Sequence, residues 1–296
     1  MSTTAQGSVG VQSEVVERKK RPIRVSTILL TMLFVILGLM FLLPLYWMIT
    51  SSIKPTEEIF TSGFNLIPAH VTLDNYINLL TTSAYPRWFF NSISQSAGYA
   101  LISVTVCSMG GFALAKYSFR FQNVTFISIL VVQMVPFHLL LVSLYVIIVN
   151  LHIVDTYWGA LLPLAAHPIG IFFMRQSMLS LDDEILNSAR VDGANEYQMF
   201  WSIVLPSIRP AIATLLVLFS LEYWNNLLWP LIAFRSAQNF PLAVGIASMV
   251  NLEYHADWGG LMAASTLATV PIIVLFFFLR RQFMEGITAT GTGVEK

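Results

Sequence analysis

Long apolar runs, each nearly free of charged residues, alternate with short polar stretches along most of this chain. About 20 apolar residues are enough for a helix to cross the hydrocarbon core of a bilayer. The runs that reach or approach this length are Val25–Ile53, Trp88–Ala115, Phe121–His152, Thr156–Met174, Pro210–Phe234 and Trp258–Leu279. The pattern therefore predicts an all-α membrane protein with six transmembrane helices.

Composition agrees with a membrane location. Of the 296 residues, 56% are hydrophobic and 11% are charged, and the mean hydropathy is +0.69. Soluble domains carry about 25% charged residues. The net charge of zero argues against a nucleic-acid-binding protein. The single cysteine, Cys107, excludes a disulfide framework within the chain, and its apolar surroundings favour a packing role over a reactive thiol.

The N-terminal region has two competing interpretations, a signal peptide or a retained helix. Residues 1–17 are polar and are predicted to be disordered. A basic cluster follows, and the uncharged run 25–53 is far longer than the apolar part of a signal peptide. We therefore expect a retained first helix. The expected regions are a basic tail at 1–24, a first span at 25–53, an extracytoplasmic loop with short helices at 54–87, a five-helix core at 88–284 and a C-terminal tail at 285–296.

The distribution of Lys and Arg predicts the orientation in the membrane, because cytoplasmic loops carry an excess of both. Only Lys54, Arg87 and Arg235 fall on one side of the six predicted spans, and the other 13 of the 16 basic residues fall on the opposite side. The distribution predicts that both termini and the segment 181–210 are cytoplasmic. Those 13 residues are Arg18, Lys19, Lys20, Arg21, Arg24, Lys116, Arg120, Arg175, Arg190, Arg209, Arg280, Arg281 and Lys296.

The segment 181–210, between the fourth and fifth predicted spans, is rich in charge yet helical in pattern. Asp182 or Ser180 can cap a short helix, and Gly193 stands where that helix would end. Asn195, with Gln198 three residues later, predicts a second helix start with a capping box. A short amphipathic helix in a loop between spans is suited to contact with another protein.

This loop resembles the "EAA" loop of the permeases of bacterial ABC importers. The matching elements are Asp192-Gly193-Ala194 and, further on, Leu205-Pro206, whereas Asn187 and Ser188 stand where Glu and Ala are usual. The resemblance implies that the loop forms a coupling helix that docks on a separate ATPase subunit. We expect Ile185, Leu186 and Ala189 to fill its cleft and Arg190 and Asp192 to contact the rim. The full expected coupling set is Glu184, Ile185, Leu186, Asn187, Ser188, Ala189, Arg190, Asp192, Gly193 and Ala194.

A second run narrows the resemblance to carbohydrate importers. Residues 224–231 read WNNLLWPL and resemble the WNDFLWPL run of permeases similar to the second membrane subunit of the maltose importer, with Asn226 in place of Asp. Further matches lie at 241–245, 257–259, 262–264 and 286–289. The resemblance implies the type I importer permease fold, in a bacterial plasma membrane. Its implied partners are a second permease, favouring a heterodimer over a homodimer, two ABC ATPase subunits and an extracytoplasmic solute-binding protein.

The sequence contains no motif for catalysis or for a cofactor. A Gly-rich phosphate loop, a His-Glu-x-x-His zinc motif and a Gly-x-Ser-x-Gly elbow are all missing from it. Four of the histidines, His138, His152, His167 and His255, lack metal-ligand spacing. We therefore expect a non-enzymatic subunit without cofactor or metal, for which partner subunits bind and hydrolyse ATP.

Glu222 is the acidic residue placed clearly inside a predicted span, where an ionisable group indicates a function or a buried hydrogen bond. Together with Trp224, Asn225 and Asn226 it forms a possible translocation path for a sugar or polyol, whereas Trp229 suits either a ligand or an interface anchor.

An alternative is an ion-coupled secondary transporter using Glu222. That class favours paired broken helices in two repeats, and the sequence suggests neither. An intramembrane enzyme would need a catalytic constellation.

Overall fold

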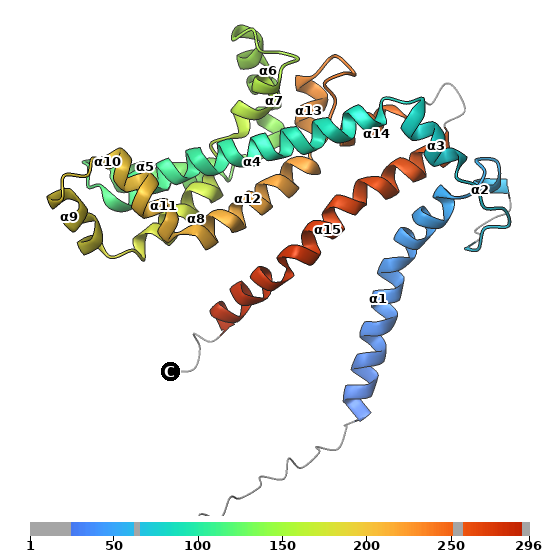
Figure 1. Cartoon of the computed structure of the whole chain (residues 1–296), viewed down its shortest axis with the longest axis horizontal. Helices are drawn as coiled ribbons and strands as arrows, with labels where there is room; N and C mark the ends of the chain where they lie inside the picture. Colours follow the sequence, from blue (N-terminus) through green and yellow to red (C-terminus); the bar gives the residue numbers. More distant parts are fainter. Residues whose placement is uncertain (1–24, 62–65, 251–256, 292–296) are drawn as a thin grey trace, which may run out of the picture. The chain divides into compact units, whose positions relative to one another are not determined.

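The computed structural model describes residues 25–61, 66–250 and 257–291, and within these ranges the regular elements are all helices (Figure 1). The predicted basic tail at 1–24 and the last five residues lie outside the described ranges. The helices are α1 Val25–Ser52, α2 Glu58–Thr61, α3 Asp74–Thr81, α4 Tyr85–Lys116, α5 Gln122–Val132, α6 Phe137–Asn150, α7 Tyr157–Leu161, η1 Leu162–Leu164, α8 Pro168–Leu179, α9 Asp183–Val191, α10 Glu196–Met199, η2 Phe200–Val204, α11 Leu205–Ser207, α12 Arg209–Trp224, α13 Leu228–Ala233, α14 Leu242–Ser248 and α15 Trp258–Gly291.

The chain divides into two units, residues 1–46 and 47–296. The described part of the first unit is α1 up to Tyr46, and its side chains from Leu29 to Pro44 are exposed. An exposed apolar helix of this length suits a lipid environment, and the stretch Leu29–Ser52 is long and apolar enough to cross a bilayer. The structure thus agrees with a helix at the predicted first span.

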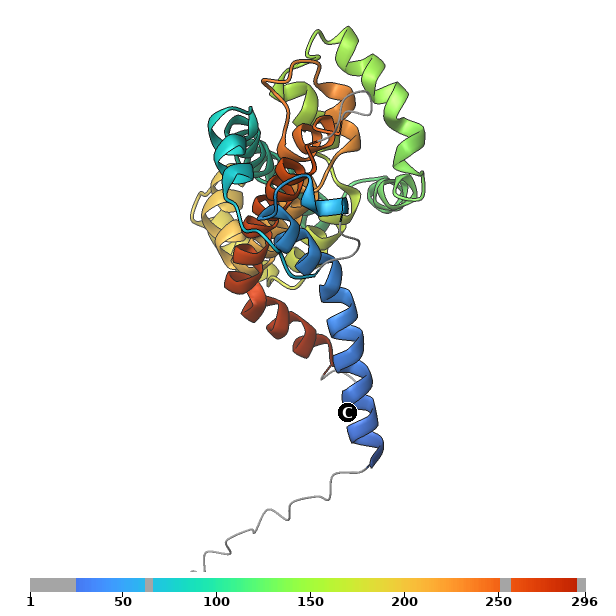
Figure 2. The same ribbon diagram turned by 90° about the vertical axis from the view of Figure 1, so that its right-hand side faces the viewer.

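The centre of the second unit is the long helix α4, which packs against α8 and α12 (Figures 1 and 2). Small residues allow the close approach, as is common where helices meet in membranes. A Cβ atom at Gly111 would lie 2.7 Å from the Cβ of Met174 on α8. A Cβ atom at Gly170 would lie 2.7 Å from the sulfur of Cys107, which is fully buried. The expected packing role of Cys107 fits this contact.

A polar stripe on α4 holds the segment between α13 and α14. The Asn91 side chain donates to the carbonyls of Gln238 and Phe240 at 2.8 and 3.0 Å, and Gln95 donates to that of Asn239 at 2.9 Å. Trp88 lies one turn earlier, where a Cβ atom on Gly245 would come within 2.3 Å of its ring. The residues that match the sugar-permease pattern around 241–245 therefore pack on the start of α4.

The turn between α6 and α7 is fastened to the end of α13 through Asp155, whose backbone φ is +60°. Its carboxylate accepts hydrogen bonds from the backbone N–H groups of Arg235 and Ser236 at 3.0 and 3.1 Å, from the Ser236 hydroxyl and from the Asn239 amide at 3.2 Å. Partial burial raises the pKa of Asp155, but these hydrogen bonds outweigh it and hold the pKa at about 2.

Three predicted spans are interrupted, although the sequence suggested no paired broken helices. The run 121–152 forms α5 and α6, bent by 104° around Pro136, and the run 156–174 forms α7, η1 and α8, bent by 56° before Pro168. The run 210–234 divides into α12 and α13 at residues 225–227. Proline explains the first two interruptions, since it lacks a backbone N–H and disfavours helical backbone in the residue before it. His167, before Pro168, is accordingly extended.

Candidate translocation cavity and coupling loop

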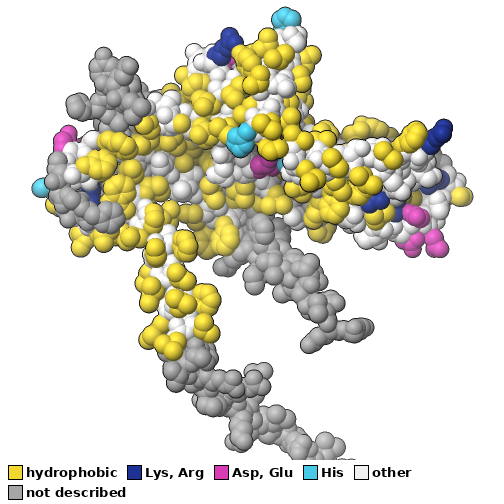
Figure 3. Space-filling model, turned by 180° about the vertical axis from the view of Figure 1, so that it is seen from behind, with side chains coloured by type: hydrophobic (Ala, Val, Ile, Leu, Met, Phe, Trp, Pro, Cys, Tyr) yellow, Lys and Arg dark blue, Asp and Glu magenta, His cyan; other side chains and the backbone are white. Residues whose placement is uncertain are grey.

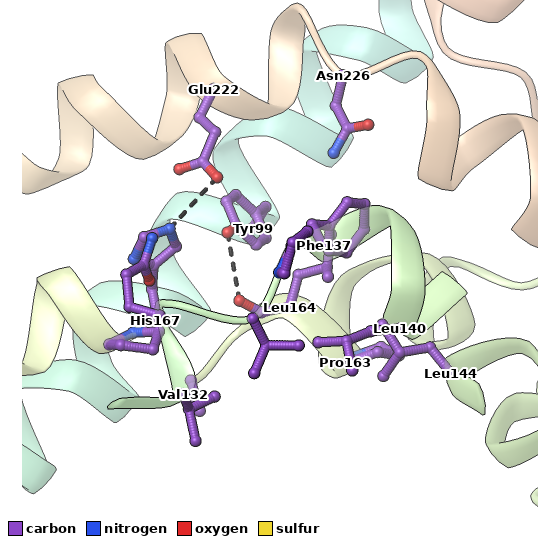
Figure 4. Close-up of a pocket in the computed structure, with 15 residues that line it drawn as sticks. Tyr99, Val132, Phe137, Leu140, Leu144, Pro163, Leu164, His167, Glu222 and Asn226 are labelled. Atoms are coloured by element: carbon purple, nitrogen blue, oxygen red, sulfur yellow. Dashed lines mark hydrogen bonds and ion pairs between the residues drawn. The ribbon is translucent and has the colours of Figure 1, made fainter. Parts of the chain in front are cut away.

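All three helix interruptions border one cavity of about 500 Å³ in the second unit (Figure 4). Backbone without helical hydrogen bonds is tolerated at membrane depth where it lines a cavity or is buried in protein. This volume lies within the usual range of ligand pockets. The residues that line it are Tyr99, Val132, Gln133, Val135, Pro136, Phe137, Leu140, Leu144, Pro163, Leu164, Ala166, His167, Pro168, Glu222 and Asn226.

A carboxylate and an imidazole face each other across this cavity. Glu222 projects from α12 toward His167, and their Oε1 and Nε2 atoms are 3.5 Å apart (Figure 4). The hydroxyl of Tyr99, from α4, donates to the carbonyl of Leu164 at 3.3 Å, which fixes its ring beside them. Glu222 therefore contacts protein and an open cavity, as expected of an ionisable group inside a span.

The structure divides the predicted translocation residues into two groups. Glu222 and Asn226 line the cavity. Asn225 instead donates to the carbonyl of Leu221 at 2.8 Å, and Trp224 packs edge-on against Phe89 at 5.9 Å. Trp229 is wholly buried and donates to the carbonyl of Ala160 at 2.9 Å. Its burial corrects both expectations for Trp229, since it is neither a cavity ligand nor an interface anchor.

Sequence reasoning missed two polar lining residues, Gln133 and His167. Each lies in an apolar run close to a proline, Pro136 and Pro168 respectively. Proline opens the helix, and the neighbouring polar side chain then lines the resulting cavity. The signal was available as a polar residue within three positions of a proline inside a predicted span.

The capping pattern in the loop is confirmed. Asp182 caps α9 by accepting from the N–H of Glu184 at 3.0 Å, whereas the Ser180 hydroxyl bonds to Ser177 instead. Gly193 has φ of +84°, and its N–H and that of Ala194 bond to the carbonyls of Arg190 and Ala189 at 3.1 and 3.0 Å. This is the Schellman arrangement that ends a helix with a left-handed residue.

The second helix start in the loop is confirmed as well. The side chain of Asn195 accepts from the N–H of Gln198 at 2.8 Å, and the side chain of Gln198 accepts from the N–H of Asn195 at 2.9 Å. These two bonds form the predicted capping box. The chain then continues through α10, η2 and α11, and α12 follows after a bend of 83°.

The inner face of α9 differs from expectation. Leu186 is only 3% exposed and lies in the core cluster of this chain, against which Ala189 also packs. Neither side chain can therefore fill the cleft of a partner without unpacking. The outward apolar side chains are Ile185 and Val191, which are 52% and 88% exposed. Glu184, Asn187, Ser188, Arg190 and Asp192 are exposed around them.

Charged contacts hold the loop in place. Lys116, at the end of α4, donates to the carbonyl of Leu181 at 2.7 Å and to the carboxylate of Asp183 at 2.6 Å. Arg190 donates to Glu196 and Asn187, each at 3.1 Å, and therefore binds within the loop. The Tyr117 hydroxyl also bonds to Glu196; this bond and the one from Arg190 lower the pKa of the Glu196 carboxyl.

Surface chemistry separates the loop from the rest of the second unit. Apolar side chains cover most of the face seen in Figure 3, and charged side chains gather at the end that α9 and α10 form. Among the described residues, no group of three or more His, Cys, Asp or Glu side chains could hold a metal ion. Within the described ranges, the cavity with its few polar groups and this charged loop are candidate functional features.

Comparison with known proteins identifies the family. Residues 107–288 match the family described as the inner membrane component of binding-protein-dependent transport systems. The chain is 36% identical to the arabinooligosaccharides transport system permease protein AraQ of Bacillus subtilis (strain 168), a match that covers 89% of this chain and 95% of the relative. It is 31% identical to the sn-glycerol-3-phosphate transport system permease protein UgpE of Escherichia coli O1:K1 / APEC, over 85% of this chain and 92% of the relative.

The fold has a counterpart among solved structures. A chain in the crystal structure of a bacterial ABC transporter involved in the import of the acidic polysaccharide alginate superposes with a TM-score of 0.78. The two chains are 22% identical, and the match covers 89% of this chain and 98% of that chain. Family and fold agree with the resemblance that the loop and the run at 224–231 indicated. The chain belongs to the family of inner membrane components of binding-protein-dependent transport systems.

Proposed function

We propose that this chain is the permease subunit of an ATP-binding-cassette importer for a saccharide or a related polyol, and that it forms half of the translocation pathway. The observation that carries the proposal is the cavity of about 500 Å³ bordered by three helix interruptions, in a chain whose relatives include an arabinooligosaccharides permease. A second permease, a heterodimer in preference to a homodimer, would complete the pathway. A binding protein would deliver the solute, and two ATPase subunits would drive transport.

Helices α1, α4 and α15 are each long and apolar enough to span, and up to six spans follow if each bent pair counts as one, the pairs being α5 with α6, α7 with α8, and the stretch α10–α11 with α12. The excess of Lys and Arg supports an orientation with both termini and the loop 181–210 in the cytoplasm of a bacterial cell. Reporter fusions after Arg120 and Ser180 should report the cytoplasm, and one after Asp74 the exterior. A reversed pattern would overturn this orientation and the role of the loop.

Helix α9 is the proposed contact with the ATPase subunit, through its outward side chains and not through Leu186. Ile185→Asp should reduce co-purification of the ATPase subunit and leave the melting temperature of the permease unchanged, because Ile185 is exposed. Leu186→Ala should lower the stability by about 2–5 kcal/mol, since it opens a cavity in the core. Normal co-purification of the Ile185→Asp variant would exclude this face as the contact.

Uptake assays separate the proposed importer from the secondary-transporter alternative. Proteoliposomes with both permeases, the ATPase subunits and the binding protein should accumulate solute only with ATP and should stop when vanadate is added. A protonophore should leave the rate unchanged. Uptake that continues without ATP and is abolished by Glu222→Gln would favour the secondary transporter instead.

A further inference from the structure

The described side chains that line the cavity include one acidic group but no Lys or Arg. Its lining contains the carboxylate of Glu222 and the imidazole of His167, and none of the lining residues is Lys or Arg. With Glu222 ionised, this pair carries a net charge between minus one and zero, whichever form His167 takes. The N-terminal ends of α6 and α8, which begin at the lining residues Phe137 and Pro168, add only partial positive charge. An anionic solute would therefore lose water in the cavity without gaining a net positive side-chain charge in exchange, which is unfavourable.

Two basic side chains on or next to the surrounding helices, Arg175 and Arg235, have other partners. Arg175, on α8, donates to the carbonyl of Leu114 at 3.2 Å and stacks over the ring of Phe126 at 4.2 Å. Arg235 bonds to the hydroxyl of Tyr145. Both guanidinium groups are thus held in contacts outside the lining of the cavity.

The polar groups of the cavity match hydroxyl groups. An ionised Glu222 only accepts hydrogen bonds, so it suits the O–H donors of a sugar or polyol and not an anion that only accepts. The amide of Gln133 can donate a hydrogen bond to a hydroxyl group or accept one from it, and Asn226, whose Oδ1 accepts from the N–H of Trp229 at 3.3 Å, can donate through its amide N–H groups. Phe137 adds an apolar ring to the lining of the cavity, against which the C–H face of a sugar ring can lie (Figure 4).

We propose that this cavity admits neutral, hydroxyl-rich solutes and rejects anionic ones, so that the imported solute is an uncharged saccharide or polyol. This inference rests on the proposed importer function and adds the charge class of its substrate. The relatives do not decide the class, because their names include a neutral arabinooligosaccharide, a phosphate ester and an acidic polysaccharide.

The charge selectivity can be measured directly on the assembled importer in lipid nanodiscs, without transport. A cysteine replaces Leu140, which lines the cavity, and the matched control replaces Tyr197, which is exposed on the loop. Buried Cys107 remains in both variants. Each variant reacts with trimethylammonium-ethyl, sulfonatoethyl and uncharged methyl methanethiosulfonate, with and without trapping by vanadate.

We expect the cationic reagent to react about tenfold faster than the anionic one at Leu140→Cys, relative to their ratio at Tyr197→Cys. Adding Glu222→Gln should bring the ratio close to that of the control. Equal rates for both charged reagents, or no reaction with any of the three in either state, would overturn the proposal. A failure of ATP-driven uptake would instead refute the proposed function, so the two failures are distinguishable.

Protection by solutes gives a second readout on the same variant. Arabinotriose, as a neutral probe, should slow the labelling of Leu140→Cys by the uncharged reagent. sn-Glycerol 3-phosphate and trigalacturonate should not slow it at the same concentration. Protection by either anion equal to that by arabinotriose would overturn the assignment, and so would the absence of protection by arabinotriose at millimolar concentration.

Discussion

Gly193 offers a test of whether the loop transmits energy. It ends α9 with a φ of +84°, a region that side chains with a Cβ atom rarely adopt, and two backbone hydrogen bonds depend on this geometry. Gly193→Val places a β-branched residue there, for which such a backbone is a true outlier. Gly193→Asn is the matched control, because Asn tolerates the left-handed region.

The expected size of the effect follows from the backbone alone. A Cβ atom at position 193 would meet no atom within 4 Å, so the Cβ atom of either substitution fits without a clash. A residue held in an unfavourable region costs about 1–3 kcal/mol, and we expect Val to lie near the upper limit and Asn near the lower one. The packed core contributes more stability than this local cost, so the Gly193→Val variant should fold and reach the membrane. Helix α9 should, however, lose its fixed orientation relative to α10.

The assay is the ATPase activity of reconstituted importer with and without loaded binding protein. Gly193→Val should co-purify with its ATPase subunits and lose most of the stimulation by the binding protein, whereas Gly193→Asn should keep it. Energy transfer through a rigid lever requires this orientation. Normal stimulation of the Gly193→Val importer with intact assembly would show that the loop is not the coupling element.

Two further predictions concern the packing of the second unit. Gly111→Ala should lower the melting temperature because it forces α4 away from Met174, at a cost of about 1–3 kcal/mol from overpacking. Gly110→Ala should be tolerated, because its Cβ atom would lie 3.6 Å from the side chain of Ile171. Equal melting temperatures of the two variants would contradict the tight contact. Asp155 has a lowered pKa of about 2, so its stabilisation is present above its unfolded pKa and is lost as the pH falls through about 2. The melting-temperature difference between wild type and Asp155→Asn should therefore be full at neutral pH and shrink below pH 4; a constant difference would contradict this linkage.

The loop was predictable because its geometry is local. Capping by Asp182, the turn at Gly193 and the Asn195–Gln198 box each involve residues a few positions apart, so the residue types alone indicate them. The burial of Leu186 was not predictable in this way. It depends on packing against residues distant in sequence, and helical periodicity marks an apolar face without indicating whether its own chain or a partner covers it.

The helix interruptions were missed for a related reason. Apolar runs such as 121–152 satisfy a hydropathy criterion whether they form one helix or two, and a proline inside a transmembrane helix is often tolerated. Pro271 shows this, since α15 continues through it, whereas α5 ends before Pro136. The difference lies in the neighbours. Gln133, three residues before Pro136, lines the cavity with its amide, whereas the hydroxyl of Thr269, two residues before Pro271, donates to the carbonyl of Thr266 within α15 at 2.7 Å.

The three interruptions also lie between two clusters of buried residues that meet at α7, which contributes Leu161 to one and Ala160 to the other. Buried residues of α4, α8, α9 and α12 form one cluster, which includes Leu186 in the loop and Phe219 near the cavity. Buried residues of α6, α7 and α13 form another around Trp229. The chain passes between these clusters at 133–136, at 165–167 and at 225–227. Non-helical residues can absorb changes in φ and ψ while packed clusters move as units. A displacement of α9 by an ATPase subunit would therefore carry Phe219 and α12 with it, and the cavity between the clusters is the volume that such a motion must change.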